Sequence, residues 1–500
     1  MGVLLLAGMA GLYALYSRLP SLVEERAIRI LRERYDSEVE FGRFSISLFP
    51  RLVLSGEDLN LRHKGRTDVP PLISIKAFSV ESGVMDFLET PARVRKVRVE
   101  GLMIRIPRGE QKGEKPRSQP RRDAYPVEVD EFDASDVELH ILPKRADKLP
   151  LIFLIHQLEM KQAGLSRSAP FHATLTNPKP KGEIETTGHF GPWQRDDPGL
   201  TPVSGDYTFE NADLGTFRGL IGTLNSKGRY QGVLERIEAD GETSTPNFGL
   251  TISGHTLPLH TRFHAVIDGT NGETLLQPVD AQLGRSTLQA NGGVVKTPNA
   301  RGRTVALDVV VSNGRLEDLL SLAVKGEPPL TGAVRFRTQF LLPPGEQDVV
   351  DRLGLKGRFI VSSAGFTGSE VKEKLKTLSR RGQGKPKDVD AGSEIFNLRG
   401  RFLLQDGILH LSDLHFRVAG AVVHLNGQYA LRKEELDFRG TLRLQAKLSQ
   451  TTTGVKSFLL KAVDPFFAKE GAGAVIPIKV TGTRSKPEFG LAMGGNSQKK

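Results

Sequence analysis

The chain has 500 residues, no cysteine and a formal net charge of +11. The lack of cysteine excludes disulfides and thiol chemistry, and the length suffices for one large core or several. The 53 glycines suit a protein with many turns, and a hydrophobic fraction of 38% is modest for a thick globular core. The positive charge favours anionic partners such as phospholipid headgroups, lipopolysaccharide or nucleic acid, although dispersed basic residues also serve plain solubility.

The first segment is apolar. Gly2 to Tyr16 carries no charge, and a helix over residues 1–19 would be roughly 28 Å long, close to the thickness of a bilayer's hydrocarbon core. A signal peptide is the alternative, but no basic stretch precedes Val3 and no small-residue cleavage pattern follows Tyr16. The sequence therefore predicts a single transmembrane anchor. The orientation of this anchor stays open. Arginines follow the apolar stretch, and the positive-inside rule alone would put the C-terminal side in the cytoplasm.

Residues 21–40 have the pattern of a helix. Ser21 can cap it with Glu24 at the capping-box position, and Leu22, Ile28 and Leu31 recur at near-helical spacing. Its basic face can lie against anionic headgroups. The other interpretation is an amphipathic helix that covers the start of a sheet.

From Val39 onwards the hydrophobic period changes to two, which is typical of strands with one buried and one solvated face. The clearest run spans residues 396–448, where Asp406-Gly407 separates two alternating segments. Asp-Gly between such segments indicates a tight hairpin. The sequence predicts an antiparallel strand ladder with few helices, one of them a basic helix at Ser369 to Arg381 followed by a loop at 382–392.

Several stretches resemble the AsmA family of bacterial envelope proteins. They are residues 41–56 (FGRFSISLFPRLVLSG) after the anchor, residues 396–440, KLSQT at 447–451, DPFF at 464–467, and IPIKVTGTR at 476–484 with Pro487. The family, which is similar to TamB and to the chorein-type bridge proteins, implies an inner-membrane anchor with the bulk of the chain in the periplasm. It also implies a folded-over β-sheet groove that carries phospholipids between membranes. The chain departs from the family in lacking a basic arm before the anchor.

On this basis the chain is expected to be mainly β, with a transmembrane helix followed by a repeating β-groove. The expected parts are an anchor at 1–19, a helix with a chorein-like β start at 20–110, and a flexible loop at 111–123. A middle β-groove at 124–368, a basic helix and loop at 369–392, and an AsmA-like β region at 393–500 complete the chain.

Alternation also selects the side chains that would line an apolar groove. The predicted lining residues are Phe336, Phe340, Leu404, Phe416, Val418, Leu425, Leu436, Phe438, Leu442 and Leu444. Acyl chains need such a surface, since each buried CH₂ contributes about 0.8 kcal/mol. The competing interpretation is a β-sandwich whose apolar faces close on each other.

The sequence predicts no catalytic residues, no metal site and no cofactor. His255, His260 and His264 are the closest histidines, but no cysteine or paired carboxylate joins them. No phosphate-loop, dinucleotide or hydrolase motif is present. Nucleic acid is not expected as a partner, because aromatic residues fall mostly on apolar-face positions instead of beside the basic ones.

Two functions follow from the sequence. The first is a non-enzymatic protein of the inner membrane that binds and conducts phospholipids or other anionic lipids and supports envelope integrity. The alternative is a scaffold or chaperone-like factor in outer-membrane protein assembly, which would use open sheet edges.

Overall fold

The protein is described here from a computed structural model. It describes residues 37–40, 42–63, 73–89, 92–107, 127–142, 151–163, 167–192, 194, 197–269, 272–297, 302–383, 395–445 and 475–492, with Val23, Glu25, Ala27 and Arg29. These residues form two compact units. Unit 1 takes its residues from 1–212, 226–239 and 268–271, and unit 2 takes its residues from 213–225, 240–267 and 272–500. The first boundary lies inside the segment 124–368.

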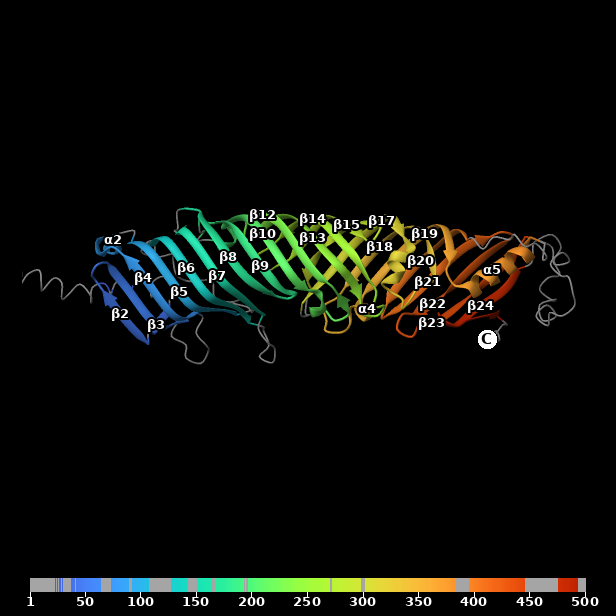
Figure 1. The fold of residues 1–500 in the computed structure, drawn as a ribbon, viewed down its shortest axis with the longest axis horizontal. Helices are drawn as coiled ribbons and strands as arrows, with labels where there is room; N and C mark the ends of the chain where they lie inside the picture. The colour runs from blue at the N-terminus through green and yellow to red at the C-terminus, as the bar shows by residue number, and fades with distance from the viewer. Residues whose placement is uncertain are drawn as a thin grey trace, which may run out of the picture. The chain divides into compact units, whose positions relative to one another are not determined.

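Unit 1 is a ladder of strands with short helical segments (Figure 1). Its elements are β1 (Ser37–Glu40), β2 (Arg43–Ser47), β3 (Leu52–His63), β4 (Ile73–Ser82), α2 (Val84–Leu88), β5 (Ala92–Pro107), β6 (Val127–Leu142), β7 (Leu151–Ala163), β8 (Ala169–Pro178), β9 (Lys181–Phe190), η1 (Pro198–Leu200), β10 (Pro202–Asp213) and most of β12 (Thr223–Val233). Neighbours in sequence pair from β3 to β9.

Unit 2 is also built mostly of strands. Its elements are η2 (Leu214–Thr216), β11 (Leu220–Ile221), most of β13 (Arg236–Leu250), β14 (Thr256–Ile267), β15 (Thr274–Leu283), β16 (Ser286–Lys296), β17 (Arg303–Arg315), α3 (Leu316–Ser321), β18 (Leu330–Leu342), α4 (Val349–Arg352), β19 (Gly354–Phe366), α5 (Ser369–Gly382), β20 (Phe396–Gln405), β21 (Ile408–Val418), β22 (Ala421–Ala430), β23 (Glu435–Leu444), β24 (Val475–Thr483) and β25 (Pro487–Leu491). Each strand from β14 to β25 pairs antiparallel with the next.

The prediction of a mainly β, largely antiparallel protein with few helices is confirmed. One pair departs from it, because β5 and β6 run parallel. Antiparallel neighbours can be joined by a short turn, whereas parallel neighbours need a crossover connection. The sequence between these two strands, residues 108–126, includes the predicted loop 111–123 and lies outside the described residues.

The predicted helix at 21–40 is wrong at its C-terminal end. Val23, Glu25, Ala27 and Arg29 are helical, but Ser37–Glu40 forms strand β1, which pairs with Asn60 to His63 of β3. Cross-strand hydrogen bonds to β3 therefore override the helical pattern. Val23 is fully buried beside Leu52 and Leu54, while Glu25 and Arg29 are exposed and joined by a 2.6 Å ion pair. The described part of the helix is thus amphipathic and covers the start of the sheet.

Among the described residues, no helix combines the length and the apolar character needed to cross a membrane. The predicted anchor at 1–19 lies outside the part of the chain that the structure describes, as do most of the loop 382–392 and residues 446–474. A basic helix is present as α5, at the position where the sequence predicts one.

Candidate functional site: an apolar sheet face

The main candidate site is one face of the ladder in unit 2. A single cross-strand row of directly paired residues crosses every strand from β14 to β25. Its members are Phe263, Val279, Ala290, Val309, Thr338, Gly357, Phe402, Leu411, Gly427, Phe438, Val480 and Phe489. Because directly paired residues point to the same side of a sheet, the row defines one face, which we call the apolar face.

A second row runs beside the first. Its members from β17 to β23 are Leu307, Phe340, Leu355, Leu404, Leu409, Tyr429 and Leu436. Thr338 is the one hydroxyl-bearing residue of the first row, and its Oγ1 donates to the backbone carbonyl of Gln339 at 3.1 Å. Because the Thr338 hydroxyl has this local partner, it leaves no unpaired polar group in the first row, and the apolar face stays apolar across the strands.

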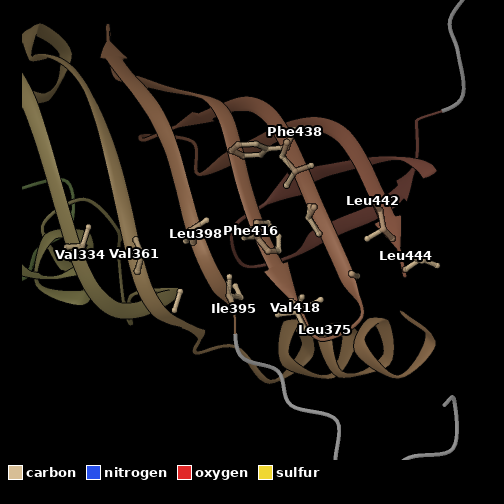
Figure 2. Packing of buried hydrophobic residues seen from close by; sticks show 14 residues of the cluster. Val334, Val361, Leu375, Ile395, Leu398, Phe416, Val418, Phe438, Leu442 and Leu444 are labelled. Carbon is tan, nitrogen blue, oxygen red and sulfur yellow. The ribbon is translucent and has the colours of Figure 1, made fainter. Parts of the chain in front are cut away.

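The structure brings most of the predicted lining residues together. Phe416, Val418, Leu425, Phe438, Leu442 and Leu444 are buried in one cluster (Figure 2). Phe336 and Leu436 pack against this cluster. Leu404 belongs to a neighbouring buried cluster that Leu436 also contacts. Phe340 is in neither cluster, but it lies opposite Leu355, which is itself paired with Leu404. All ten residues are buried or half-buried, and none is on the exposed side of its strand.

Burial along the apolar face is uneven. Seven of the predicted lining residues are less than 10% exposed, from Val418 at 4% to Phe416 and Leu442 at 9%, while Phe336, Phe340 and Leu436 are half-buried. Further toward the N-terminal side of unit 2, Leu257, Leu259 and Phe263 of β14 are also half-buried. The apolar face is therefore more accessible at Leu257, Leu259 and Phe263 of β14 and at Phe336 and Phe340 of β18 than at the buried residues of β20 to β23, while Val311 and Val334 are buried.

Helix α5 covers one end of the closed part. Leu375 is buried in the main cluster, and Val371 and Leu378 pack against it. Figure 2 shows α5 lying across the end of β21, the strand that carries Phe416 and Val418. On its solvent side, Lys374 pairs with Glu370 at 2.7 Å and places its ammonium group 4.4 Å from the ring centre of Phe489. This cation–π contact ties the helix to the last described strand.

Glycines under aromatic rings are a feature that sequence reasoning missed. A Cβ on Gly357 would lie 2.7 Å from Cζ of Phe402, and one on Gly427 would lie 2.6 Å from Cδ1 of Phe438. Likewise, a Cβ on Gly400 would lie 3.2 Å from Cε1 of Phe359. A glycine inside an alternating strand is a signal for close approach of a neighbour, and aromatic cover of such glycines compensates for their missing side chain. Each ring thus lies over a glycine of the neighbouring strand and covers the place of the missing side chain.

The opposite face of β18 to β20 is charged and polar, and sequence reasoning did not bring the arginines of these three strands together. Arg335, Arg337, Arg358, Arg399 and Arg401 are all exposed on three consecutive strands. Beyond them, His415 and His424 stack edge to face with ring centres 4.6 Å apart. Burial, followed by the charges of His424, Arg399 and Arg417, lowers the pKa of His415 below its usual 6.5. This face is therefore a region of net positive potential.

The candidate metal-binding histidines are not gathered into a site. His264 Nδ1 lies 2.9 Å from an oxygen of Asp240, and His255 and His260 are exposed. Within the described residues, no group of three or more potential ligands is placed to hold a metal ion.

Comparisons with protein-family models, with curated proteins and with solved structures found no match to this chain. The resemblance to the AsmA family rests on the stretches quoted above, of which 447–451 and 464–467 lie outside the described residues.

Proposed function

We propose that this protein binds phospholipids on the apolar face of unit 2 and conducts them between the inner and outer membranes of a bacterial envelope. In this proposal residues 1–19 anchor the chain in the inner membrane and the rest lies in the periplasm. The apolar face is proposed to serve as the groove for acyl chains. The protein acts as a surface and carries out no chemical reaction.

The observation that supports the proposal most strongly is the continuous cross-strand row from Phe263 to Phe489. An ordinary sandwich needs an apolar patch that matches a second sheet, whereas acyl chains need an unbroken apolar track. Each CH₂ group that leaves water contributes about 0.8 kcal/mol, so a track that spans several strands is enough to hold a whole acyl chain. Half-burial of Phe263, Phe336 and Phe340 leaves apolar surface for such a chain to cover.

A charge placed on the track tests the proposal. Phe336→Asp with Phe340→Asp would put two carboxylates where acyl chains are proposed to lie, and burying an unpaired charge against them is costly. We expect phospholipid recovered with the purified full chain, measured by mass spectrometry, to fall several-fold. Gln339→Asp with Leu341→Asp is the matched control, because it adds the same two charges at exposed positions on the same strand, β18. Equal phospholipid in the track and control variants, both with β-rich circular dichroism, would contradict the proposal.

The scaffold function is supported by one observation, the edge of β25. In the part of the chain that the structure describes, β25 pairs on one side with β24, and Phe489 is 47% exposed. An open edge can accept a strand from another protein. However, β25 is short and carries Pro487 and Glu488, which blunt an edge. An unfolded outer-membrane porin that co-purifies with the chain, without phospholipid, would favour the scaffold.

A further inference from the structure

The polar face of β18 to β20 carries an arginine ladder, which we define as Arg335, Arg337, Arg358, Arg399 and Arg401. Arg337 lies directly opposite Arg358, and Arg358 lies directly opposite Arg401. Arg335 and Arg399 flank Ile360 in the adjacent row. The five guanidinium groups are thus held on neighbouring strands by the register of the sheet.

This arrangement is unfavourable unless an anion joins it. Directly opposed side chains have Cβ atoms about 4.5–5.5 Å apart, and like charges in that position destabilise a sheet. Arg401 pairs with Asp413 at 3.1 Å, but both side chains are well exposed. Among the described residues, no ion pair or hydrogen bond is found for the side chains of Arg335, Arg337, Arg358 and Arg399. Five cations and one nearby carboxylate leave a strong excess of positive charge.

The ladder also lines a cavity. A hollow of about 550 Å³ is bounded by all five arginines, Ile360, Asp413 and their strand neighbours. Most of its lining residues occupy outward positions of their strands, so it opens on the polar face, and Val311, Phe336, Phe359 and Gly400 also line it. Its size falls in the range of sites for small organic ligands. Ile360, which is 49% exposed, gives the hollow an apolar patch between charged walls.

The geometry points to a binding site for a phosphate group carried on a partly apolar molecule. The planar guanidinium fork matches the oxygens of phosphate in a bidentate way, which makes arginine the usual residue for this anion. Several forks around one hollow can share a phosphate monoester or diester, and Ile360 can contact the carbon part of the molecule. A phospholipid headgroup and a soluble phosphate ester both present this chemistry. The inference does not depend on lipid binding at the apolar face.

The test compares a ladder variant with a charge-matched control in the full chain. Arg337→Gln, Arg358→Gln and Arg401→Gln together remove three cations from the ladder. Arg229→Gln, Arg236→Gln and Arg262→Gln remove three exposed cations from β12 to β14. Inorganic phosphate, against chloride at equal ionic strength, probes the free anion. Vesicles of phosphatidylglycerol, against phosphatidylcholine, probe the headgroup.

We expect the wild type and the control to bind phosphatidylglycerol vesicles, phosphate, or both. The ladder variant should bind at least about tenfold more weakly. A rise in the melting temperature with phosphate identifies a free anion, while a response to phosphatidylglycerol vesicles alone identifies a headgroup. Single Arg358→Gln should raise the melting temperature without ligand, because it relieves repulsion with Arg337 and Arg401 on the two neighbouring strands. The same change should weaken binding, because it removes one guanidinium group from the ladder. Equal binding by the ladder variant and the control, or equal loss in both, would overturn the inference.

Discussion

The ring of Phe402 meets the ring of Phe336 edge to face, with centres 6.1 Å apart and an interplanar angle of 81°. These two residues come from β20 and β18, and the ring of Phe359 on the intervening strand lies 6.3 Å from Phe402. The three rings therefore bridge the accessible and the closed parts of the apolar face, and Phe402 also covers Gly357.

Shortening Phe402 tests this aromatic bridge. Phe402→Leu keeps an apolar side chain but removes two ring pairs, each worth about 0.5–1.5 kcal/mol, so we expect a loss of about 1–3 kcal/mol of stability. Urea unfolding followed by circular dichroism measures it. Phe396→Leu on the same strand is the control, because Phe396 is 43% exposed; its effect should stay within about 0.5 kcal/mol. Equal effects of the two changes would mean that the rings do not stabilise the face.

Gly440 allows close approach between β22 and β23. A Cβ at this position would lie 1.8 Å from the carbonyl oxygen of His424, which is backbone and cannot rotate away. We expect Gly440→Ala to cost about 2 kcal/mol or more through forced separation of the strands. Thermal unfolding measures the loss. Gly365→Ala is the matched control, since its nearest neighbour would be Oγ1 of Thr331 at 3.6 Å. A melting temperature for Gly440→Ala equal to that of the control would refute this view of the strand contact.

Helix α5 is expected to depend on Leu375 for its attachment. Leu375→Ala removes a buried side chain from the main cluster and should cost about 2–3 kcal/mol. Because α5 covers one end of the closed face, the variant should also bind more of an apolar dye and exchange the amide hydrogens of α5 faster. Thr377→Ala, an exposed position on the same helix, provides the comparison. Unchanged exchange in α5 after Leu375→Ala would show that the helix is held by other contacts.

His415 should make stability depend on pH. Its pKa in the folded protein is lowered by burial, by His424 and by Arg399 and Arg417, so the unfolded chain binds a proton at a pH where the folded chain does not. Its stabilising contribution is complete above about pH 6.5, the ordinary value, and is lost as the pH falls through the folded pKa. We expect the melting temperature of His415→Gln to fall less than that of the wild type between pH 7.5 and pH 5. Parallel curves for the two proteins would contradict this assignment.

The period-two pattern predicted the Asp-Gly hairpin and the two faces of β18. Asp406 and Gly407 form the predicted turn, with φ of 51° and 70°, and Gln405 pairs with Ile408 across it. Alternation also placed Phe340 on a different side from Gln339 correctly, because successive side chains in a strand point to opposite faces.

The pattern could not predict which residues lie opposite one another. Register shifts occur between Phe263 and Ala265 and between Val311 and Gly314, and a hydrophobic period does not reveal such irregularities. The rows of the apolar face and the arginine ladder both depend on that register. Local pattern also failed at 37–40, where pairing with β3 replaced the helix.

The most direct test of lipid binding uses two neighbouring residues that face opposite sides of β18. A photoreactive benzoylphenylalanine replaces Phe340 on the apolar face or Gln339 on the polar face, and the full chain is illuminated in cells labelled with radioactive phosphate. In a background with Arg337→Gln, Arg358→Gln and Arg401→Gln, which removes anion binding at the arginine ladder, we expect a labelled phospholipid adduct at position 340 and none at position 339. Labelling at neither position, or equal labelling at both, would contradict the claim that phospholipids occupy the apolar face.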